Sequence, residues 1–287
     1  MLYLGCAVWA FRDWVGEFYP AGARSQDFLK LYSDRLTAVE GNTTFYSIPD
    51  ACTVDRWAAQ TPETFRFCPK LPRLYTHHGA LMPHVPAALD FLTLMERLGP
   101  RLGPIFMQLP PSYSPARFTD LADFLTAWPQ KRAAIAVEVR HLGWFQPPHT
   151  DALNGLLTRL GVGRVLLDTR PIYDDLEPAE VDPQLASERR KPKVPLQPVV
   201  TAPFALVRYI SHPDLPRNER FFKTWVPRLS TWLQQGTAVY LFIHCPDEAQ
   251  SPAIARHVYT CLQSAGAAVS PLPWLSLAQP PAQLTLF

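Results

Sequence analysis

Short apolar segments recur along the chain, and amphipathic stretches separate most of them. The apolar segments are rich in β-branched, aromatic and aliphatic residues, which is the pattern of buried strands. The stretches between them repeat apolar residues at three- and four-residue steps, which is the period of a helix. Alternation of this kind is typical of parallel βαβ units and predicts a protein of the α/β class. The expected strands cover residues 2–8, 36–41, 65–70, 103–109, 133–139, 162–168, 204–210 and 238–244.

These eight strands and their intervening helices predict a TIM-like (β/α)8 barrel. The clearest helix has Phe222, Trp225 and Leu229 on one face, and it ends before Gly236, where a glycine suits the helix cap. We expect this aromatic stripe to face the core. The other expected helices cover residues 28–36, 87–98, 118–128, 152–160 and 253–262.

The connection between the sixth and seventh strands breaks this rhythm. Residues 169–203 contain seven prolines, the acidic run DDLEPAE and the basic run ERRKPK, without sustained apolar periodicity. They predict a long loop in place of a helix, so the barrel is irregular between strands six and seven. Such a loop is either a solvated excursion or a lid that contacts anions at the barrel mouth.

Composition agrees with one globular domain over residues 1–279, followed by a short tail at 280–287. The chain has 287 residues, of which 47% are hydrophobic, 12% aromatic and 18% charged, and its net charge of +2 gives no case for a nucleic-acid or membrane coat. The five cysteines include no C-x-x-C pair, which argues against a disulfide framework or structural zinc. We expect a cytoplasmic protein with no membrane segment, because no leader or long apolar run is present.

Polar residues stand at the end of nearly every expected strand. Because the carboxyl ends of parallel strands in a barrel meet at one face, these side chains are expected to form a single charged pocket. Burying charge without a partner is costly, so acids and bases should balance one another there. The residues are Glu40, Asn42, Lys70, Gln108, Glu138, Arg140, Asp168, Arg208 and His244.

The charged residues of this expected pocket suggest proton transfer combined with charge stabilisation. Glu138 as general base and Glu40 as partner acid would divide the work if their environments separate their pKa values. Asp168 is a third candidate carboxylate for catalysis. The cations that would hold an anionic or oxyanion-forming substrate are Lys70, Arg140 and Arg208.

A divalent metal is an alternative occupant, with Glu40, Glu138, Asp168 and His244 as its ligands. We do not favour a metal, because the nearby cations would repel it and no H-x-x-H pair fixes ligands on one element. No cofactor is expected, since the chain lacks G-x-G-x-x-G, phosphate-loop and G-x-S-x-G motifs. Each charged residue also has a purely structural interpretation as half of a buried ion pair.

Aromatic residues and one histidine that follow expected strands are candidate walls of the pocket. Trp9, Tyr46 and Trp144 would offer ring surfaces to a substrate, and His77 would lie in the loop above the mouth. Packing or helix capping alone would also explain these residues. The remaining candidates for substrate binding are Asn42, Gln108, Arg208 and His244.

Several segments, taken in order, resemble the domain-of-unknown-function family 72, also called YecE-like. They are GCAVWAFRDWVGEFYP, VEGNTTFYSIP, FRFCPKLPRLYTH, LGPIFMQLPPSY, AVEVRHLGWF and RVLLDTR, and they run along nearly the whole chain. The resemblance implies a TIM-like barrel with a cavity at its strand ends, without an established reaction. The chain departs from the family pattern after the eighth strand, where His244 stands in place of an expected amide. The pocket positions that the resemblance implies are Glu40, Asn42, Tyr46, Lys70, His77, Gln108, Glu138, Arg140, Trp144 and Arg208.

Three functions fit this reading of the sequence. The first is a hydrolase or lyase that acts on an anionic substrate, such as a nucleotide or a nucleic-acid phosphoester. The second is a non-catalytic module that binds a small ligand or a nucleic-acid end during DNA replication or repair. The third is a glycosidase with Glu40 and Glu138 as its carboxylate pair, which in a retaining enzyme would lie about 5 to 5.5 Å apart.

The tail carries a motif of its own, because QLTLF at 283–287 resembles the Q-L-x-L-F peptide by which bacterial proteins dock on the DNA polymerase sliding clamp. Leu286 and Phe287 would enter an apolar pocket of the clamp, while Gln283 would donate or accept a hydrogen bond beside it and Leu284 would extend the contact. The alternative is an apolar tail that packs on its own barrel.

We expect purified sliding clamp to bind the intact protein, and to lose binding to a double variant with Leu286→Ala and Phe287→Ala. The two side chains would each contribute roughly 1.5–3 kcal/mol if fully buried in the complex. Titration of the clamp with both proteins measures this difference. Equal binding by both proteins, or no binding by either, would contradict the motif.

Overall fold

The structure, a computed structural model, describes residues 1–174 and 191–277. All eight predicted strands are present in it, and each pairs in parallel with at least one other strand. The strands are β1 Leu2–Cys6, β2 Ala38–Gly41, β3 Arg66–Pro69, β4 Ile105–Gln108, β5 Ile135–Glu138, β6 Gly163–Asp168, β7 Phe204–Ile210 and β8 Ala238–His244.

The strands form two sheets, of which the larger has the order β1-β8-β7-β6-β5-β4 and the smaller pairs β2 with β3. Isolated bridges connect β3 to the region of β4. Beside β1, the N–H of Thr37 donates to the carbonyl of Leu4 at 3.0 Å, and a Cβ on Gly5 would lie 1.9 Å from the carbonyl oxygen of Ala38. The α/β class is confirmed as a six-stranded half-barrel sheet, whereas strand pairing does not continue around a ring of eight in the described residues.

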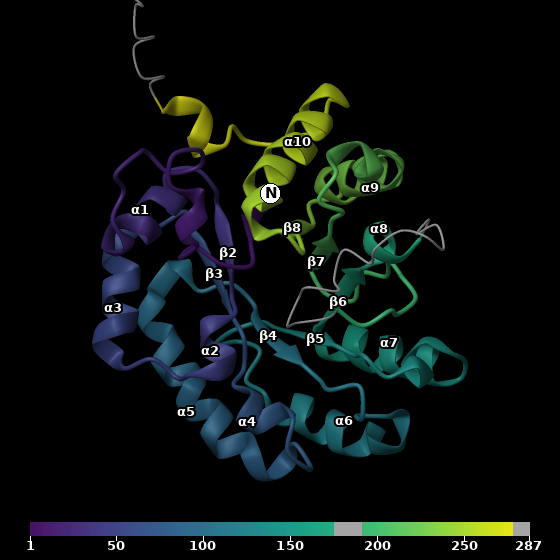
Figure 1. Ribbon diagram of the computed structural model, residues 1–287. Helices are drawn as coiled ribbons and strands as arrows, with labels where there is room; N and C mark the ends of the chain where they lie inside the picture. The colour runs from purple at the N-terminus through teal and green to yellow at the C-terminus, as the bar shows by residue number, and fades with distance from the viewer. Residues whose placement is uncertain (175–190, 278–287) are drawn as a thin grey trace, which may run out of the picture.

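Helices lie around the outside of the strands (Figure 1). All six expected helices are present with slightly different ends, and Phe222, Trp225 and Leu229 of α9 are buried as predicted. They are α1 Phe28–Ser33, α5 Val85–Met95, α6 Phe118–Ala127, α7 His149–Leu160, α9 Glu219–Gln234 and α10 Ser251–Ser264.

One further helix, α3 Ala51–Gln60, was not expected from the sequence. The carboxylate of Asp50 caps it by accepting the N–H of Thr53 at 2.7 Å. Within the helix only Val54 and Trp57 are buried, so its apolar period is too sparse to stand out. Three one-turn helices follow strand ends, namely α2 Thr43–Tyr46, α4 Arg73–Thr76 and α8 Arg170–Tyr173.

The connection from β6 to β7 is irregular where it is described. It opens with α8, and residues 191–203 contain neither helix nor strand. The runs DDLEPAE and ERRKPK fall largely outside the described residues, as do residues 283–287 of the expected clamp-binding peptide. No helix in the described part of the chain is long and apolar enough to cross a membrane.

The inner faces of the strands carry an apolar layer below a polar one. Residues i and i+2 of a strand share a face, so the residue two positions beyond each buried apolar residue lies directly above it. Ala136 is thus followed by Glu138, and Phe106 by Gln108. The apolar layer consists of Ala38, Cys68, Phe106, Ala136, Val165, Phe204, Leu206, Tyr240 and Phe242.

Candidate functional site

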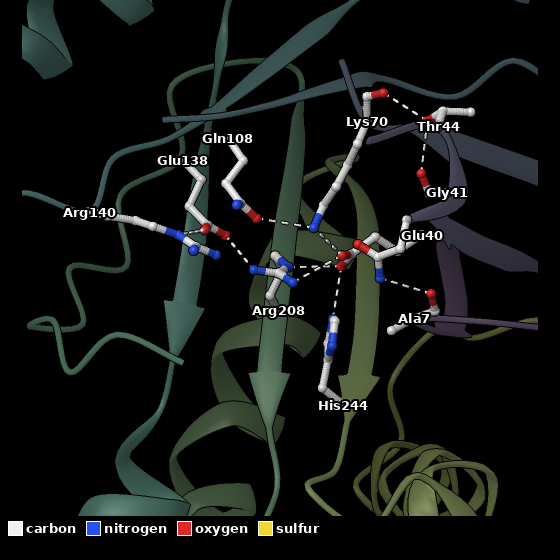
Figure 2. A network of polar contacts seen from close by, with 11 residues as sticks. Ala7, Glu40, Gly41, Thr44, Lys70, Gln108, Glu138, Arg140, Arg208 and His244 are labelled. Atoms are coloured by element: carbon white, nitrogen blue, oxygen red, sulfur yellow. Dashed lines mark hydrogen bonds and ion pairs between the residues drawn. The ribbon is translucent and has the colours of Figure 1, made fainter. Parts of the chain in front are cut away.

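A buried polar network sits on top of the inner apolar layer, at the carboxyl ends of the strands (Figure 2). Its side chains come from five of the eight strands, β2, β4, β5, β7 and β8, and from residues just beyond β3 and β5. The structure therefore brings together most of the charged residues that the strand ends predicted. The network members are Glu40, Lys70, Gln108, Glu138, Arg140, Arg208 and His244.

Arg208 of β7 lies between the two glutamates and binds both of them (Figure 2). Its Nε and Nη2 donate to Oε2 and Oε1 of Glu40 at 2.8 and 2.9 Å. Its Nη1 donates to Oε2 of Glu138 at 2.7 Å. All three side chains are at most 1% exposed, so these ion pairs form with almost no water nearby.

Further basic groups lie close to the same two carboxylates. Nζ of Lys70 lies 2.9 Å from Oε1 of Glu40, and Nε2 of His244 lies 2.8 Å from Oε2 of the same carboxylate. Nε of Arg140 donates to Oε1 of Glu138 at 2.6 Å. Each carboxylate oxygen therefore has at least one donor, which is what a buried charge requires.

Both carboxylates are held in the ionised form. Burial alone would raise the pKa of Glu138, but Arg140 and Arg208 outweigh it and lower the pKa to about 2. Burial likewise opposes ionisation of Glu40, yet Arg208 and Lys70 hold its pKa well below the usual value. Both pKa values are shifted in the same direction, so no separation between them supports the acid and base pair that the sequence suggested, and that pairing stays a prediction.

Three basic groups, Lys70, His244 and His77, are shifted in the direction of their neutral forms, whereas Glu138 and Glu40 outweigh burial and raise the pKa of Arg208. Burial, reinforced by the charge of Arg208, lowers the pKa of Lys70 to about 7, although Glu40 opposes the shift. Burial lowers the pKa of His244 to about 3 despite its contact with Glu40, so the neutral ring donates to that carboxylate. Burial and the charge of Arg140 lower the pKa of His77 to about 4.

A cavity of about 240 Å³ opens above this network. Among the described residues its lining contains five cationic side chains and no carboxylate, because the glutamates lie beneath. A ring of Phe45 and the partly exposed Tyr46 supply aromatic surface, and His77 contacts Phe45 edge-on at 5.1 Å between ring centres. The lining residues are Asn42, Phe45, Tyr46, Lys70, Arg73, His77, Gln108, Arg140, Lys191 and Arg208.

The backbone around the cavity is fixed by side-chain hydrogen bonds. The amide Nδ2 of Asn42 donates to the carbonyl of Ala7 at 2.9 Å, which ties the end of β2 to the end of β1. The hydroxyl of Thr44 lies 2.7 Å from the carbonyl oxygen of Lys70 and 2.9 Å from that of Gly41 (Figure 2). These contacts hold the ends of β2 and β3 together where Glu40 and Lys70 must meet.

Asp168 does not belong to the network, which corrects its expected catalytic role. It accepts two hydrogen bonds from the guanidinium group of Arg170, at 2.9 and 2.8 Å, and a third from the backbone N–H of Arg170 at 3.1 Å. Nε1 of Trp225 donates a further one at 2.7 Å. On β6 the residue of the inner face is Leu167, packed with Ile210, so Asp168 points outward to α9. The sequence held a signal for this direction, because Asp168 lies three positions after the inward residue Val165, and residues at an odd spacing in a strand point to opposite faces.

Two tryptophans expected as pocket walls lie elsewhere. Trp144 is fully buried, and its Nε1 donates to the carbonyl of Tyr113 at 2.7 Å, so it serves packing. Trp9 contacts Trp57 of α3 edge-on at 5.3 Å between ring centres and does not line the cavity. Both follow strands by several residues, where the direction of a side chain no longer follows from strand alternation.

Three lining residues were not expected from the sequence, namely Phe45, Arg73 and Lys191. Lys191 belongs to the basic run ERRKPK. The expectation that this loop contacts anions at the barrel mouth is the signal that could have identified Lys191. Arg73 begins α4, a single turn without an apolar period. The set considered for a metal is not assembled, because Asp168 points away and no cluster of three potential ligands occurs among the described residues.

Comparison with known proteins agrees with this architecture. UPF0759 protein YecE of Escherichia coli is 35% identical over 288 residues, which span 100% of both chains. UPF0759 protein YunF of Bacillus subtilis is 29% identical over 156 residues, or 52% of this chain and 54% of that protein.

Two crystal structures share the fold. A DUF72 family protein from Thermotoga maritima aligns with a TM-score of 0.66 and 21% identity, over 92% of this chain and 99% of that one. A DUF72 family protein from Enterococcus faecalis aligns with a TM-score of 0.65 and 18% identity, over 94% and 97%. The family model described as "Protein of unknown function DUF72" matches residues 3–277. The chain therefore belongs to the DUF72 family.

Proposed function

We propose that the cavity binds a small substrate by its phosphate or carboxylate group, and that the protein is a hydrolase or lyase acting on it. The observation that carries this proposal is the separation of charge at the site. Five cations line the cavity in the described residues, whereas the two carboxylates that pair with three of them lie below. The cationic side chains of this lining face the opening, which favours an anionic occupant.

The buried glutamates would act as fixed counterions in this function. Glu138 holds Arg140 and Arg208 in place through bonds of 2.6 and 2.7 Å, so the two guanidinium groups are oriented before a ligand arrives. Donors that are oriented in advance need little rearrangement when charge develops on the substrate. Arg140 is 14% exposed at its side chain and is thus accessible to a ligand.

Proton transfer would fall to Lys70, which replaces Glu138 as the proposed acid or base. A group whose pKa lies near the working pH exchanges protons most effectively, and the pKa of Lys70 is about 7. Glu138, with a pKa of about 2, is too weak a base at neutral pH. The same argument disfavours the glycosidase alternative, since that mechanism needs one carboxyl group with a raised pKa.

Two finer expectations remain proposals. We propose that the two sheets act as one TIM-like (β/α)8 barrel, supported by the bridges beside β4 and the hydrogen bond between Thr37 and Leu4. We also propose that the QLTLF tail recruits the protein to the sliding clamp, which rests on the sequence alone. A non-catalytic role in binding a nucleic-acid end is the corresponding alternative.

We expect sulfate to bind in the cavity, and its affinity to fall about tenfold between pH 6 and pH 9. Sulfate keeps its charge over this range, whereas Lys70 with its pKa of about 7 loses a proton, and Lys191, with a pKa lowered by burial to about 8, changes in the same direction. Glu40, Glu138 and Arg208 keep their charges, because their pKa values lie outside the range. Loss of one nearby positive charge weakens attraction by roughly 1 kcal/mol or more.

Calorimetric titration of sulfate at several pH values measures this dependence. Lys70→Met should bind more weakly and show a flatter pH profile, while Lys30→Met, at an exposed lysine on α1, should behave like the natural protein. Absence of sulfate binding at pH 6 would contradict the proposed function.

Glu138→Gln is expected to lower the free energy of unfolding at pH 7 by about 3 kcal/mol, because it removes the buried counterion of Arg140 and leaves Arg208 with only one of its two carboxylates, Glu40. The folded-state pKa of Glu138 is depressed to about 2, so its contribution is complete above the usual carboxyl value and disappears as pH falls toward 2. Denaturant unfolding at pH 7 and pH 3 therefore should show a difference that shrinks in acid. A variant as stable as the natural protein at pH 7 would argue that Glu138 is not a counterion.

A further inference from the structure

The amine of Lys70 has an unusual hydrogen-bonding environment. Its Nζ lies 2.9 Å from Oε1 of Glu40 and 3.1 Å from Oε1 of Gln108 (Figure 2). Both partners are oxygens that accept hydrogen bonds, and Lys70 is 3% exposed. No third acceptor for this nitrogen occurs among the described residues, although its side chain lines the cavity.

Two acceptors match the donors of a neutral amine. An ammonium group has three N–H donors, whereas a neutral amine has two and carries a lone pair at the fourth tetrahedral position. With one N–H donated to Oε1 of Gln108 and the other on the side of the Glu40 carboxylate, which lies 2.9 Å away as an ion-pair partner, the neutral form would leave its lone pair available to a molecule in the cavity. The rings of Phe106 and Phe45 have their centres 4.6 and 5.6 Å from Nζ and cover part of its surroundings.

The charged groups around Lys70 make that neutral form accessible at physiological pH. Burial and Arg208 lower its pKa, Lys191 adds to the effect, and Glu40 and Glu138 oppose it, with a net value of about 7. A lysine in this condition combines an unprotonated fraction with the nucleophilicity of a primary amine. The lowered pKa of Lys70 therefore agrees with its two acceptor contacts, which suit a neutral amine.

We propose that Lys70 is a nucleophile that forms an imine with an aldehyde or ketone substrate bearing a phosphate or carboxylate group. This inference rests on the proposed anion-binding function and names the substrate class. The lone pair of Nζ attacks the carbonyl carbon, a C–N bond forms, and the carbonyl oxygen takes up a proton. The resulting carbinolamine loses its hydroxyl as water after a second proton reaches that oxygen, and the nitrogen gives up one of its hydrogens, which yields a protonated imine.

The surrounding residues suit each part of this substrate. The protonated imine retains one N–H, and the Glu40 carboxylate at the amine position can accept it and offset its positive charge. The phosphate or carboxylate would lie against Arg140 and Arg73, which line the same cavity. A volume of about 240 Å³ admits only a small molecule or the small end of a larger one.

Reductive trapping tests this inference on the full-length protein. The protein is incubated at pH 7 with glyceraldehyde 3-phosphate or with pyruvate in the presence of sodium cyanoborohydride, which reduces an imine to a stable secondary amine. Peptide mass mapping then locates the adduct. We expect Lys70 to be modified at least tenfold more than the exposed lysines Lys30 and Lys223. Of the two probes, the more reactive one identifies whether phosphate or carboxylate is preferred.

Matched controls separate specific from random modification. Glyceraldehyde without a phosphate should label Lys70 more weakly, and sulfate should compete with labelling by the phosphorylated probe. Lys70→Arg keeps a positive charge but should abolish the dominant adduct, while Lys30→Arg should leave it unchanged.

The outcomes also distinguish this inference from the proposed function. Modification spread evenly over exposed lysines, or no adduct at Lys70 in a protein that binds sulfate, overturns the imine while anion binding survives. If sulfate does not bind either, the proposed function fails as well. If Lys70 is labelled but sulfate does not suppress the labelling, the inference that Lys70 is a nucleophile stands, and the assignment of the anion to Arg140 and Arg73 is wrong.

Discussion

The buried ion pairs of Arg208 with two glutamates are the interaction on which the site depends. Desolvating three charged groups where strands of both sheets end is costly, and only close, multiple hydrogen bonds offset that cost. Arg208 donates from three nitrogens to three carboxylate oxygens, which fixes the positions of Glu40 and Glu138 relative to each other. Because each glutamate then binds a second cation, the positions of Lys70 and Arg140 follow from the same centre.

The pairing of buried acids and bases also determines which charged groups reach the cavity. The carboxylates are placed deep, on the apolar layer that contains Ala38 and Ala136, and the cations rise above them to the cavity. Because the buried carboxylates partly neutralise the basic side chains above them, several basic groups can lie close together without a bound ligand. It also keeps Lys70 near Arg208, whose charge adds to burial in lowering the pKa of that lysine.

Strand alternation explains how much of the site the sequence could predict. Glu40, Lys70, Gln108, Glu138, Arg208 and His244 each lie two residues beyond an inward apolar residue, so their convergence follows from strand period and from parallel topology. Asp168 is offset by one position from this pattern, because it directly follows the inward residue Leu167 and so points to the other face of β6. Trp9 and Trp144 lie in connections, where packing among elements distant in sequence decides orientation. The role of Glu138 as general base stays a prediction that the sequence alone could not examine, because a pKa depends on neighbours whose distances only the fold supplies.

A crystal structure of the protein soaked with selenate would test the charge separation most directly, because selenium can be located by its anomalous scattering. The account predicts one ordered selenate in the cavity, within hydrogen-bond distance of Arg140 and Lys70, with both carboxylates still bound to Arg208 beneath it. An empty cavity in crystals that carry selenate elsewhere would contradict the account, as would Glu40 or Glu138 turned into the cavity and away from Arg208.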